Sequence, residues 1–297
     1  MASSEYEEFK QARTSRPAAD GPVDLAVLRT TIDEAMAQLP IAEGVVVKPF
    51  VRGGVSGLEC RPADLAEDAP VVLYFHGGGF RLASSIAYRS YGSHLADVIG
   101  ARVLLVDYRL APENRFPAAA EDCFAVWESL LADGVNPNRI VIAGDSAGGG
   151  LAAAVTLHAL ADGVLPAGVI CLSPWVDLTV TAATYDSRAE LDYMFSRTAA
   201  EEAVEAYLGG QDPTHHIASP IFGDWAGAPP LLVIAGDHEV LLDDAQRLAL
   251  VAGEAGVEVT LRIYPEMPHI FPFNYPAFPE AVEGVEEMAT FVRRVTA

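Results

Sequence analysis

IVIAGDSAGG, residues 140–149, is the most informative segment of this chain. Ile140 to Ala143 form an apolar run of strand length, and the Ala- and Leu-rich residues 151–160 favour a helix. Between them, the pattern Gly-x-Ser-x-Gly predicts a sharp turn, which glycine permits on both sides. We therefore expect Ser146 at the tip of the turn, exposed above a sheet and beside a helix N-terminus.

Composition excludes several classes of protein. The chain has 297 residues, 51 % of them hydrophobic, which suits one large α/β domain or a domain with a lid. A formal net charge of −22 disfavours binding to nucleic acid or to an anionic membrane, because both would repel the chain.

Cysteines and hydropathy bear on cofactors and location. Cys60, Cys123 and Cys171 show neither a disulfide framework nor a zinc pattern, and we expect no metal and no organic cofactor. The acidic start lacks the features of a signal peptide, and no apolar run approaches the roughly 18 residues of a membrane span. A cytoplasmic location is therefore expected.

Strand-like and helix-like segments alternate along most of the chain. Continuous apolar strands joined by helices predict a mostly parallel sheet that is covered on both faces. Strands are expected at 45–51, near Leu58, and at 71–75, 102–107, 140–143, 169–172, 231–235 and 257–263; helices are expected at 25–39, 86–99, 117–131, 147–160, 199–208, 241–254 and 280–295.

The alternation breaks between residues 175 and 229, where no convincing strand is present. This interruption and the N-terminal helix are expected to form a small helical cap over the strand ends, where ligands bind in such sheets. The expected division is an N-terminal cap segment at 1–45, a catalytic domain at 46–175 and 221–297, and a cap insertion at 176–220. Residues 1 to 22 are polar and are expected to be loosely held.

A glycine run, HGGGF at residues 76–80, directly follows the expected strand 71–75. Consecutive glycines let backbone N–H groups point into a cleft and let a substrate oxygen approach closely. A phosphate-binding loop would need a following Lys-Ser/Thr or the spacing Gly-x-Gly-x-x-Gly, and neither is present. The run therefore predicts an oxyanion hole.

A serine nucleophile also needs a base and an acid, in the chain order Ser, acid, His. His269 lies in a loop after the last expected strand and is the predicted base; His94 and His158 fall inside helices, and the pair at 215–216 is expected to face solvent. Asp237 and Glu239 both follow the strand 231–235, so either can orient the histidine. Asp243 and Asp244 are expected to cap the next helix or to face solvent.

Over residues 45–297, the chain resembles the hormone-sensitive-lipase-like family of α/β-hydrolase esterases. The resemblance rests on HGGGF at 76–80, DYRLAPE at 107–113, FPA at 116–118, GDSAGG at 144–149, Ser173-Pro174 and Pro268-His269. It implies the α/β-hydrolase fold, and it implies that Gly78, Gly79 and Ala147 supply the oxyanion donors. The family's register places Glu239 at the acid position, with Asp237 as the runner-up, although the family more often uses aspartate there.

Together these features predict a serine carboxylesterase that hydrolyses small soluble esters through an acyl-enzyme. The resemblance points to short or medium acyl chains. Alternatives are an amidase or deacetylase of a specific metabolite, or a non-catalytic small-molecule receptor on the same fold. A homodimer through an edge strand or the last helix is compatible with this fold.

Aromatic residues near the expected strand ends have two interpretations. Phe80, Trp175, Tyr193 and Phe195 can line an acyl pocket, but aromatic residues equally often belong to the core. The segment 107–109, which follows a buried strand, is interpreted as a buried network that holds nearby loops.

Overall fold

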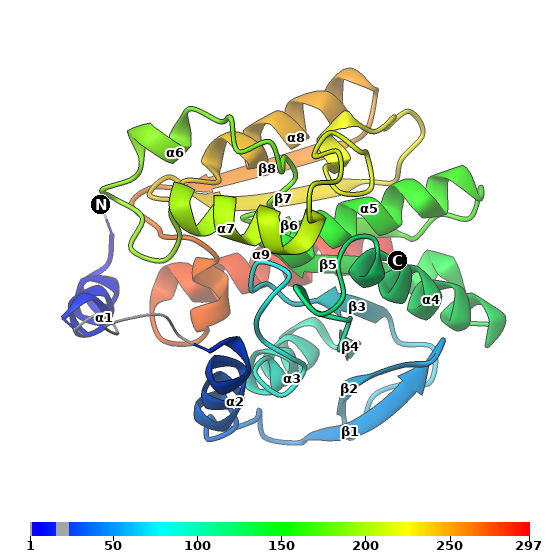
Figure 1. Ribbon diagram of the computed structural model, residues 1–297. Coiled ribbons are helices and arrows are strands. Elements are labelled where there is room, and N and C mark those ends of the chain that lie inside the picture. The colour runs from blue at the N-terminus through cyan, green and yellow to red at the C-terminus, as the bar shows by residue number, and fades with distance from the viewer. Residues whose placement is uncertain (1, 16–23) are drawn as a thin grey trace.

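The computed structural model describes residues 2–15 and 24–297, and an eight-stranded sheet lies at its centre (Figure 1). The strands lie in the order β1-β2-β4-β3-β5-β6-β7-β8. The pairs β1–β2 and β2–β4 are antiparallel, and every other neighbouring pair is parallel. Their bounds are β1 (Val45–Arg52), β2 (Val55–Pro62), β3 (Val71–Phe75), β4 (Arg102–Val106), β5 (Ile140–Asp145), β6 (Gly168–Leu172), β7 (Leu231–Gly236) and β8 (Val259–Tyr264).

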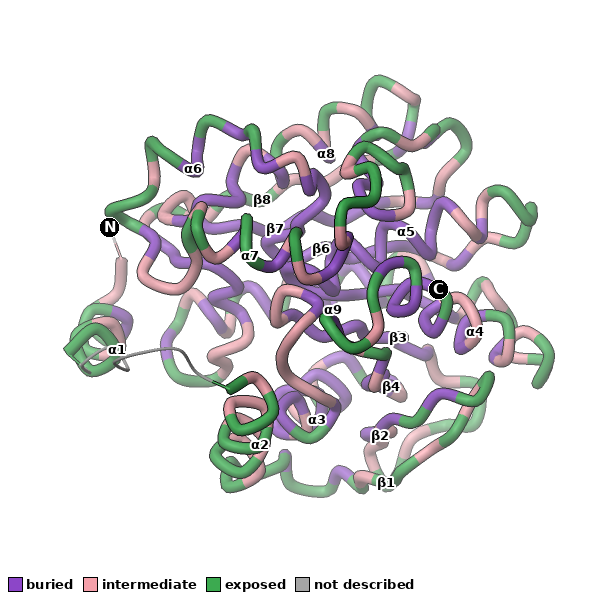
Figure 2. The backbone as a smooth tube through the Cα atoms, viewed as in Figure 1, coloured by how far each residue is buried: buried purple, intermediate pink, exposed green. Residues whose placement is uncertain are grey.

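Helices cover both faces of the sheet because successive strand residues point to opposite sides. On β3, Leu73 packs in one apolar cluster, and its neighbours Val72 and Tyr74 pack in the other. The first cluster holds α4 (Ala118–Ala132), α5 (Ala147–Ala161) and α8 (Leu242–Glu254); the second holds α3 (Arg89–Ile99) and α9 (Pro279–Val295). The central strands are buried along their length, as Figure 2 shows, so the predicted α/β fold is confirmed.

The predicted elements are present, with shifts at their ends. The helix expected at 25–39 is α2 (Leu25–Met36), and the helix expected at 86–99 begins only at Arg89. Residues 175–229 contain α6 (Thr184–Ser187), α7 (Arg197–Leu208) and the short 3-10 helix η2 (Pro220–Phe222), and they contain no strand. Such end shifts are expected where helices fray or where a turn precedes them.

The N-terminal residues correct one expectation. Residues Ser4–Thr14 form a helix, α1, which is capped by Ser3. Tyr6 is fully buried, and its ring meets Phe278 at the start of α9 edge-on, with 5.2 Å between ring centroids. The prediction of a loosely held segment is wrong for residues 4–14, because this polar helix packs through Tyr6 on Phe278, a residue near the other end of the chain. Residues 1 and 16–23 lie outside the described part of the chain.

Two segments outside the sheet lie against the loop that follows β3. On α7, Tyr207 stacks on Phe80 with ring centroids 3.9 Å apart and planes 3° apart. On α2, Arg29 donates hydrogen bonds of 2.7 Å to the carbonyl oxygens of Arg81 and Ala111. In Figure 1, α7 crosses in front of the central strands, so it and α2 hold the glycine loop from outside the sheet.

A buried carboxylate at the start of α8 corrects a second expectation. Asp244 is fully buried and accepts hydrogen bonds from the backbone N–H groups of Val176, at 3.1 Å, and Asp177, at 3.0 Å. Burial raises the pKa of Asp244 to about 8. The prediction that Asp244 caps its helix or faces solvent is therefore wrong, because its side chain is used to hold the chain that follows β6.

All three cysteines lie in the core. Cys60, Cys123 and Cys171 are all buried free thiols. Within residues 2–15 and 24–297, no helix is both long enough and apolar enough to cross a membrane.

Candidate active site

Ser146 lies at a sharp turn between β5 and α5. Its backbone has φ 54° and ψ −123°, a conformation that residues other than glycine rarely adopt. Gly148 has no room for a side chain, because a Cβ there would lie 2.0 Å from the carbonyl oxygen of Phe75. A Cβ on Gly144 would lie 2.2 Å from the carbonyl oxygen of Gly148. The two flanking glycines are therefore a steric requirement of the turn.

Three side chains from three loops form a hydrogen-bonded chain at the carboxyl ends of β5, β7 and β8. Ser146 Oγ lies 3.0 Å from His269 Nε2, and His269 Nδ1 lies 2.6 Å from Glu239 Oε2. Ser146 and His269 are each 5 % exposed, and Glu239 is fully buried. This is the geometry in which an imidazole can take the proton of a serine hydroxyl while a carboxylate fixes its tautomer.

The structure brings Glu239, and not Asp237, to the histidine. Glu239 Oε1 also accepts a 3.0 Å hydrogen bond from the backbone N–H of Gly236, which orients the carboxylate. Asp237 instead accepts a 2.6 Å hydrogen bond from the backbone N–H of Glu266 and lies 3.7 Å from His238 Nε2. Both acids follow β7, but only Glu239 points toward His269.

Carboxylates set the protonation of His269. Burial alone would lower the pKa of this imidazole, but the hydrogen bond to Glu239 and the charge of that carboxylate raise it. The charges of Asp192 and Asp145 act in the same direction, and the pKa of His269 lies above its ordinary value. A raised pKa makes this histidine a stronger base once it is deprotonated.

The loop that carries His269 is held by the end of β6. Ser173 Oγ accepts a 2.9 Å hydrogen bond from the backbone N–H of Ile270, which has φ 49°. Gly236 packs against the other side of this loop, where a Cβ would lie 1.9 Å from the carbonyl oxygen of Met267. The motif Ser173-Pro174 by itself does not predict this role, because the partner of the Ser173 hydroxyl lies 97 residues further along the chain.

The glycine loop presents free backbone donors beside the serine. Gly78 has φ 110° and Gly79 has φ 61°, both in the region that favours glycine. Among the described residues, neither N–H group has a hydrogen-bond acceptor. Ala147 is the first residue of α5, so its N–H has no partner within the helix. These three residues are the predicted oxyanion donors, and that role stays a prediction.

A buried carboxylate that the sequence analysis missed joins the serine turn to the glycine loop. Asp145 Oδ1 accepts hydrogen bonds from the hydroxyl of Tyr74, at 2.9 Å, and the backbone N–H of Gly77, at 3.2 Å; Oδ2 accepts one from Tyr88, at 2.8 Å. Burial raises the pKa of Asp145 to about 6, although these donors oppose the shift. The residue adjoins the nucleophile, but its partners lie in other segments, so no local pattern reveals them.

His76 and the segment 107–109 support the loops without entering the site. The ring of buried His76 stacks on Tyr108 at 4.3 Å, and the Tyr108 hydroxyl donates a 2.7 Å hydrogen bond to the carbonyl oxygen of His76. Asp107 accepts a 2.8 Å hydrogen bond from the Ser85 hydroxyl. Arg109 is exposed and pairs with Asp122, so the predicted network is buried only in part.

Three of the four predicted pocket residues form an aromatic group beside His269. The ring of Phe195 lies over His269, with centroids 5.9 Å apart and planes 18° apart. Trp175 meets Phe195 at 5.4 Å and Phe80 at 5.8 Å. Tyr193 is half-buried and, in the described chain, makes no ring contact with these three. The pocket role of all four residues remains a prediction.

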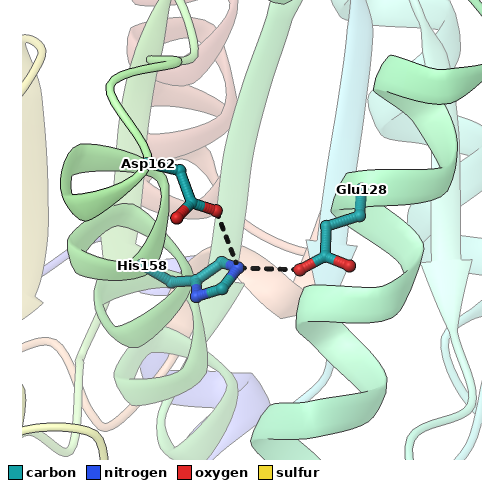
Figure 3. Close-up of side chains that lie close together, drawn as sticks. All are labelled: Glu128, His158 and Asp162. Carbon is teal, nitrogen blue, oxygen red and sulfur yellow. Dashed lines mark hydrogen bonds and ion pairs between the residues drawn. The ribbon is translucent and has the colours of Figure 1, made fainter.

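Another histidine lies between carboxylates on the surface. His158 Nε2 on α5 is 2.9 Å from Glu128 Oε1 on α4 and 3.5 Å from Asp162 Oδ2 (Figure 3). One ligand atom of each side chain lies within 4.8 Å of the others. The ring of Phe124 stacks on the imidazole at 4.2 Å. The hydrogen bond to Glu128 and the stacking on Phe124 account for this arrangement, which contains no residue of the serine site. His215 and His216 are exposed, as expected.

Known proteins share this fold and sequence over nearly the whole chain. A family described as the alpha/beta hydrolase fold matches residues 72–273. An acetyl-hydrolase of Streptomyces hygroscopicus is 41 % identical over 265 residues, which cover 89 % of this chain and 87 % of that protein. An esterase of Acinetobacter venetianus is 34 % identical over 266 residues, with coverage of 89 % and 87 %.

Solved structures of esterases have the same fold as this chain. An esterase from the bacterial hormone-sensitive lipase family is 35 % identical, with a TM-score of 0.92 and coverage of 100 % of both chains. EstE5, in crystals soaked with p-nitrophenyl butyrate, is 35 % identical, with a TM-score of 0.93 and coverage of 99 % of both chains. The chain therefore belongs to the hormone-sensitive-lipase-like family of α/β-hydrolases.

Proposed function

We propose that this protein is a carboxylic ester hydrolase that works through an acyl-enzyme on Ser146. The observation that carries the proposal is the buried hydrogen-bonded chain from Ser146 Oγ through His269 to Glu239. Relatives named as an esterase and an acetyl-hydrolase support the same class of reaction. Hydrolysis of p-nitrophenyl esters by the purified protein tests the proposal directly.

In the first half-reaction, His269 Nε2 takes the proton from Ser146 Oγ as this oxygen attacks the ester carbonyl. Glu239 stabilises the imidazolium that forms and holds its tautomer. The N–H groups of Gly78, Gly79 and Ala147 donate hydrogen bonds to the oxyanion in this proposal. The imidazolium then gives its proton to the departing alcohol, which leaves an acyl group on Ser146.

In the second half-reaction, water takes the place of the alcohol. His269 removes a proton from water as the water attacks the acyl carbonyl, and the same donors bind the new oxyanion. Collapse of this intermediate releases the carboxylic acid and returns the proton to Ser146. Besides the ester and water, both half-reactions use only Ser146, His269, Glu239 and the oxyanion donors.

The preferred acyl chains are proposed to be short to medium. The aromatic group formed by Phe80, Trp175 and Phe195 occupies space next to His269 and limits the room for a long chain. We expect activity on p-nitrophenyl esters from acetate to palmitate to peak at the short end, and Phe195→Ala to move the peak toward longer chains. Phe222→Ala, a change at an exposed phenylalanine just after the cap insertion, is the matched control. An unchanged profile in Phe195→Ala contradicts the pocket assignment.

The rate is expected to depend on the neutral form of His269. Because the pKa of this imidazole is raised, the base becomes protonated at a higher pH than an ordinary histidine. We therefore expect kcat/KM to be half-maximal at a pH above about 6.5 and to fall by about tenfold for each further pH unit of acidification. A pH–rate profile on folded protein checks this, and full activity retained at pH 5 contradicts it.

Residues 1–45 and 176–220 are proposed to act together as a cap over the site. The contacts of α2 and α7 support this, because they connect both segments to the loop after β3 that carries Gly78 and Gly79. Deletion of residues 2–15 is expected to lower kcat/KM on p-nitrophenyl butyrate relative to wild type, even when the rate is measured well below the melting temperature of the variant. An unaltered kcat/KM argues against a cap role for α1.

Assembly and location remain proposals as well. A homodimer is proposed through the free edge of β8, where Ile263 is 38 % exposed, and light scattering with Ile263→Lys tests it. A cytoplasmic location is proposed because three buried free thiols suit a reducing compartment. Cell fractionation tests the location.

A further inference from the structure

Asp192 is a buried carboxylate in the cap that has no part in the reaction described above. It lies between α6 and α7 and is 8 % exposed. Its Oδ1 accepts hydrogen bonds from the backbone N–H groups of Met194, at 2.8 Å, and Phe195, at 2.9 Å. Its Oδ2 accepts a 2.9 Å hydrogen bond from the backbone N–H of Val240.

These contacts connect the cap to the catalytic acid. Val240 directly follows Glu239, so the bond from Val240 to Asp192 fixes the loop from which the acid reaches His269. Phe195 is the residue whose ring lies over the imidazole. Oδ1 therefore sets the turn that carries the ring above His269, and Oδ2 sets the loop that carries the acid.

We propose that Asp192 is a positioning residue that couples the cap to the triad, holding Glu239 in place and stabilising the imidazolium of His269 by its charge. The inference rests on the proposed ester hydrolase function. It assigns the cap an electrostatic contribution to the reaction, in addition to covering the site.

The charged groups around His269 make this electrostatic contribution measurable. Burial lowers the pKa of the His269 imidazole, whereas the charges of Glu239 after β7, Asp192 in the cap and Asp145 in the serine turn all raise it. Asp192 is the carboxylate of the three that belongs to the cap insertion. Its three hydrogen-bond partners are all N–H donors, which suits an anion.

If Asp192 only shapes the turn, removing its charge leaves the acid limb of the pH–rate profile in place. If its charge stabilises the imidazolium, removing that charge moves the limb. Loss of the negative charge makes protonated His269 less stable, so its pKa falls and activity persists to lower pH. The position of the acid limb therefore separates the two roles.

The test is the pH dependence of kcat/KM on p-nitrophenyl butyrate for four proteins: wild type, Asp192→Asn, Asp192→Glu and Asp186→Asn. We expect Asp192→Asn to lower the plateau kcat about tenfold, and to move the acid limb down by about one pH unit. Asp192→Glu keeps the charge and should return the limb toward its wild-type position. Asp186, an exposed cap residue paired with Arg197, is the matched control, and its variant should keep both wild-type values.

The outcomes are distinct. A lower kcat in Asp192→Asn with an unmoved limb, or no change in either quantity, overturns the proposal. If Asp192→Asn does not fold, Asp192→Ser replaces it, because a hydroxyl can still accept the N–H groups of the turn but carries no charge. A folded wild type that hydrolyses no ester refutes the proposed function itself, and this result does not depend on any variant.

Discussion

Replacing Ser146 with alanine is expected to lower kcat/KM on p-nitrophenyl esters by about 10⁴-fold or more. The reason is that the acyl-enzyme cannot form, since the oxygen that lies 3.0 Å from His269 Nε2 is removed. Alanine keeps the Cβ and the small volume of serine, so the turn after β5 should retain its shape. Rates on acetate and butyrate esters, measured beside wild type with melting curves for both, check the prediction.

Ser187→Ala is the matched control, because Ser187 is an exposed serine in α6. It should keep wild-type kinetics. Covalent labelling by an organophosphate, read by mass spectrometry, gives an independent measurement: wild type should gain one adduct on Ser146, and Ser146→Ala should gain none. A folded wild type with neither turnover nor labelling would support the receptor alternative. Turnover that survives in Ser146→Ala would exclude this serine as the nucleophile.

Replacing Glu239 with glutamine is expected to lower kcat by about 10³- to 10⁴-fold with little change in KM. An amide keeps the size of the acid but removes the charge that stabilises the imidazolium. It also allows a donor to face His269 Nδ1, which favours the wrong tautomer. Glu239 is fully buried and lies 2.6 Å from Nδ1, so solvent cannot replace it.

Asp237→Asn is the matched control for this prediction. Asp237 follows the same strand, and its carboxylate binds the backbone of Glu266 instead of the histidine. We expect its kcat to stay within about threefold of wild type, since an amide oxygen can still accept that hydrogen bond. A large loss in Asp237→Asn with a small loss in Glu239→Gln would reverse the assignment of the acid.

Local sequence patterns predicted the serine turn, the glycine run and the catalytic histidine, because each depends on residues that are neighbours in the sequence. The glycines around Ser146 are required by contacts within the turn and with the adjacent strand, so the motif carries its own geometry. The glycine run after β3 and the late histidine after β8 follow apolar strands that alternate with helices. Carboxyl ends of parallel strands share one edge of a sheet, and this topology brings the three loops together.

Choice of the acid shows where local reasoning stops. Asp237 and Glu239 both follow β7, and the residues alone left them equivalent; family resemblance favoured Glu239. In the structure, the two side chains diverge because Asp237 binds the loop backbone at Glu266 and Glu239 turns inward to Gly236 and His269. That divergence depends on how the loop after β8 packs, and this loop lies about thirty residues further along the chain.

Contacts with distant segments determine which polar side chains are buried. Tyr6 is buried because it packs against Phe278. Asp244 is buried because it binds the backbone of Val176, and Asp192 is buried because it binds the backbone of Val240. A polar helix or a lone aspartate carries no sign of such a partner in its own neighbourhood. The positions of the strands and helices, the sharp turn and the nucleophile follow from short-range sterics and hydrophobic periodicity, which a sequence displays directly. Burial of a charge, and the direction in which a carboxylate points, follow from contacts that exist only after the chain has folded.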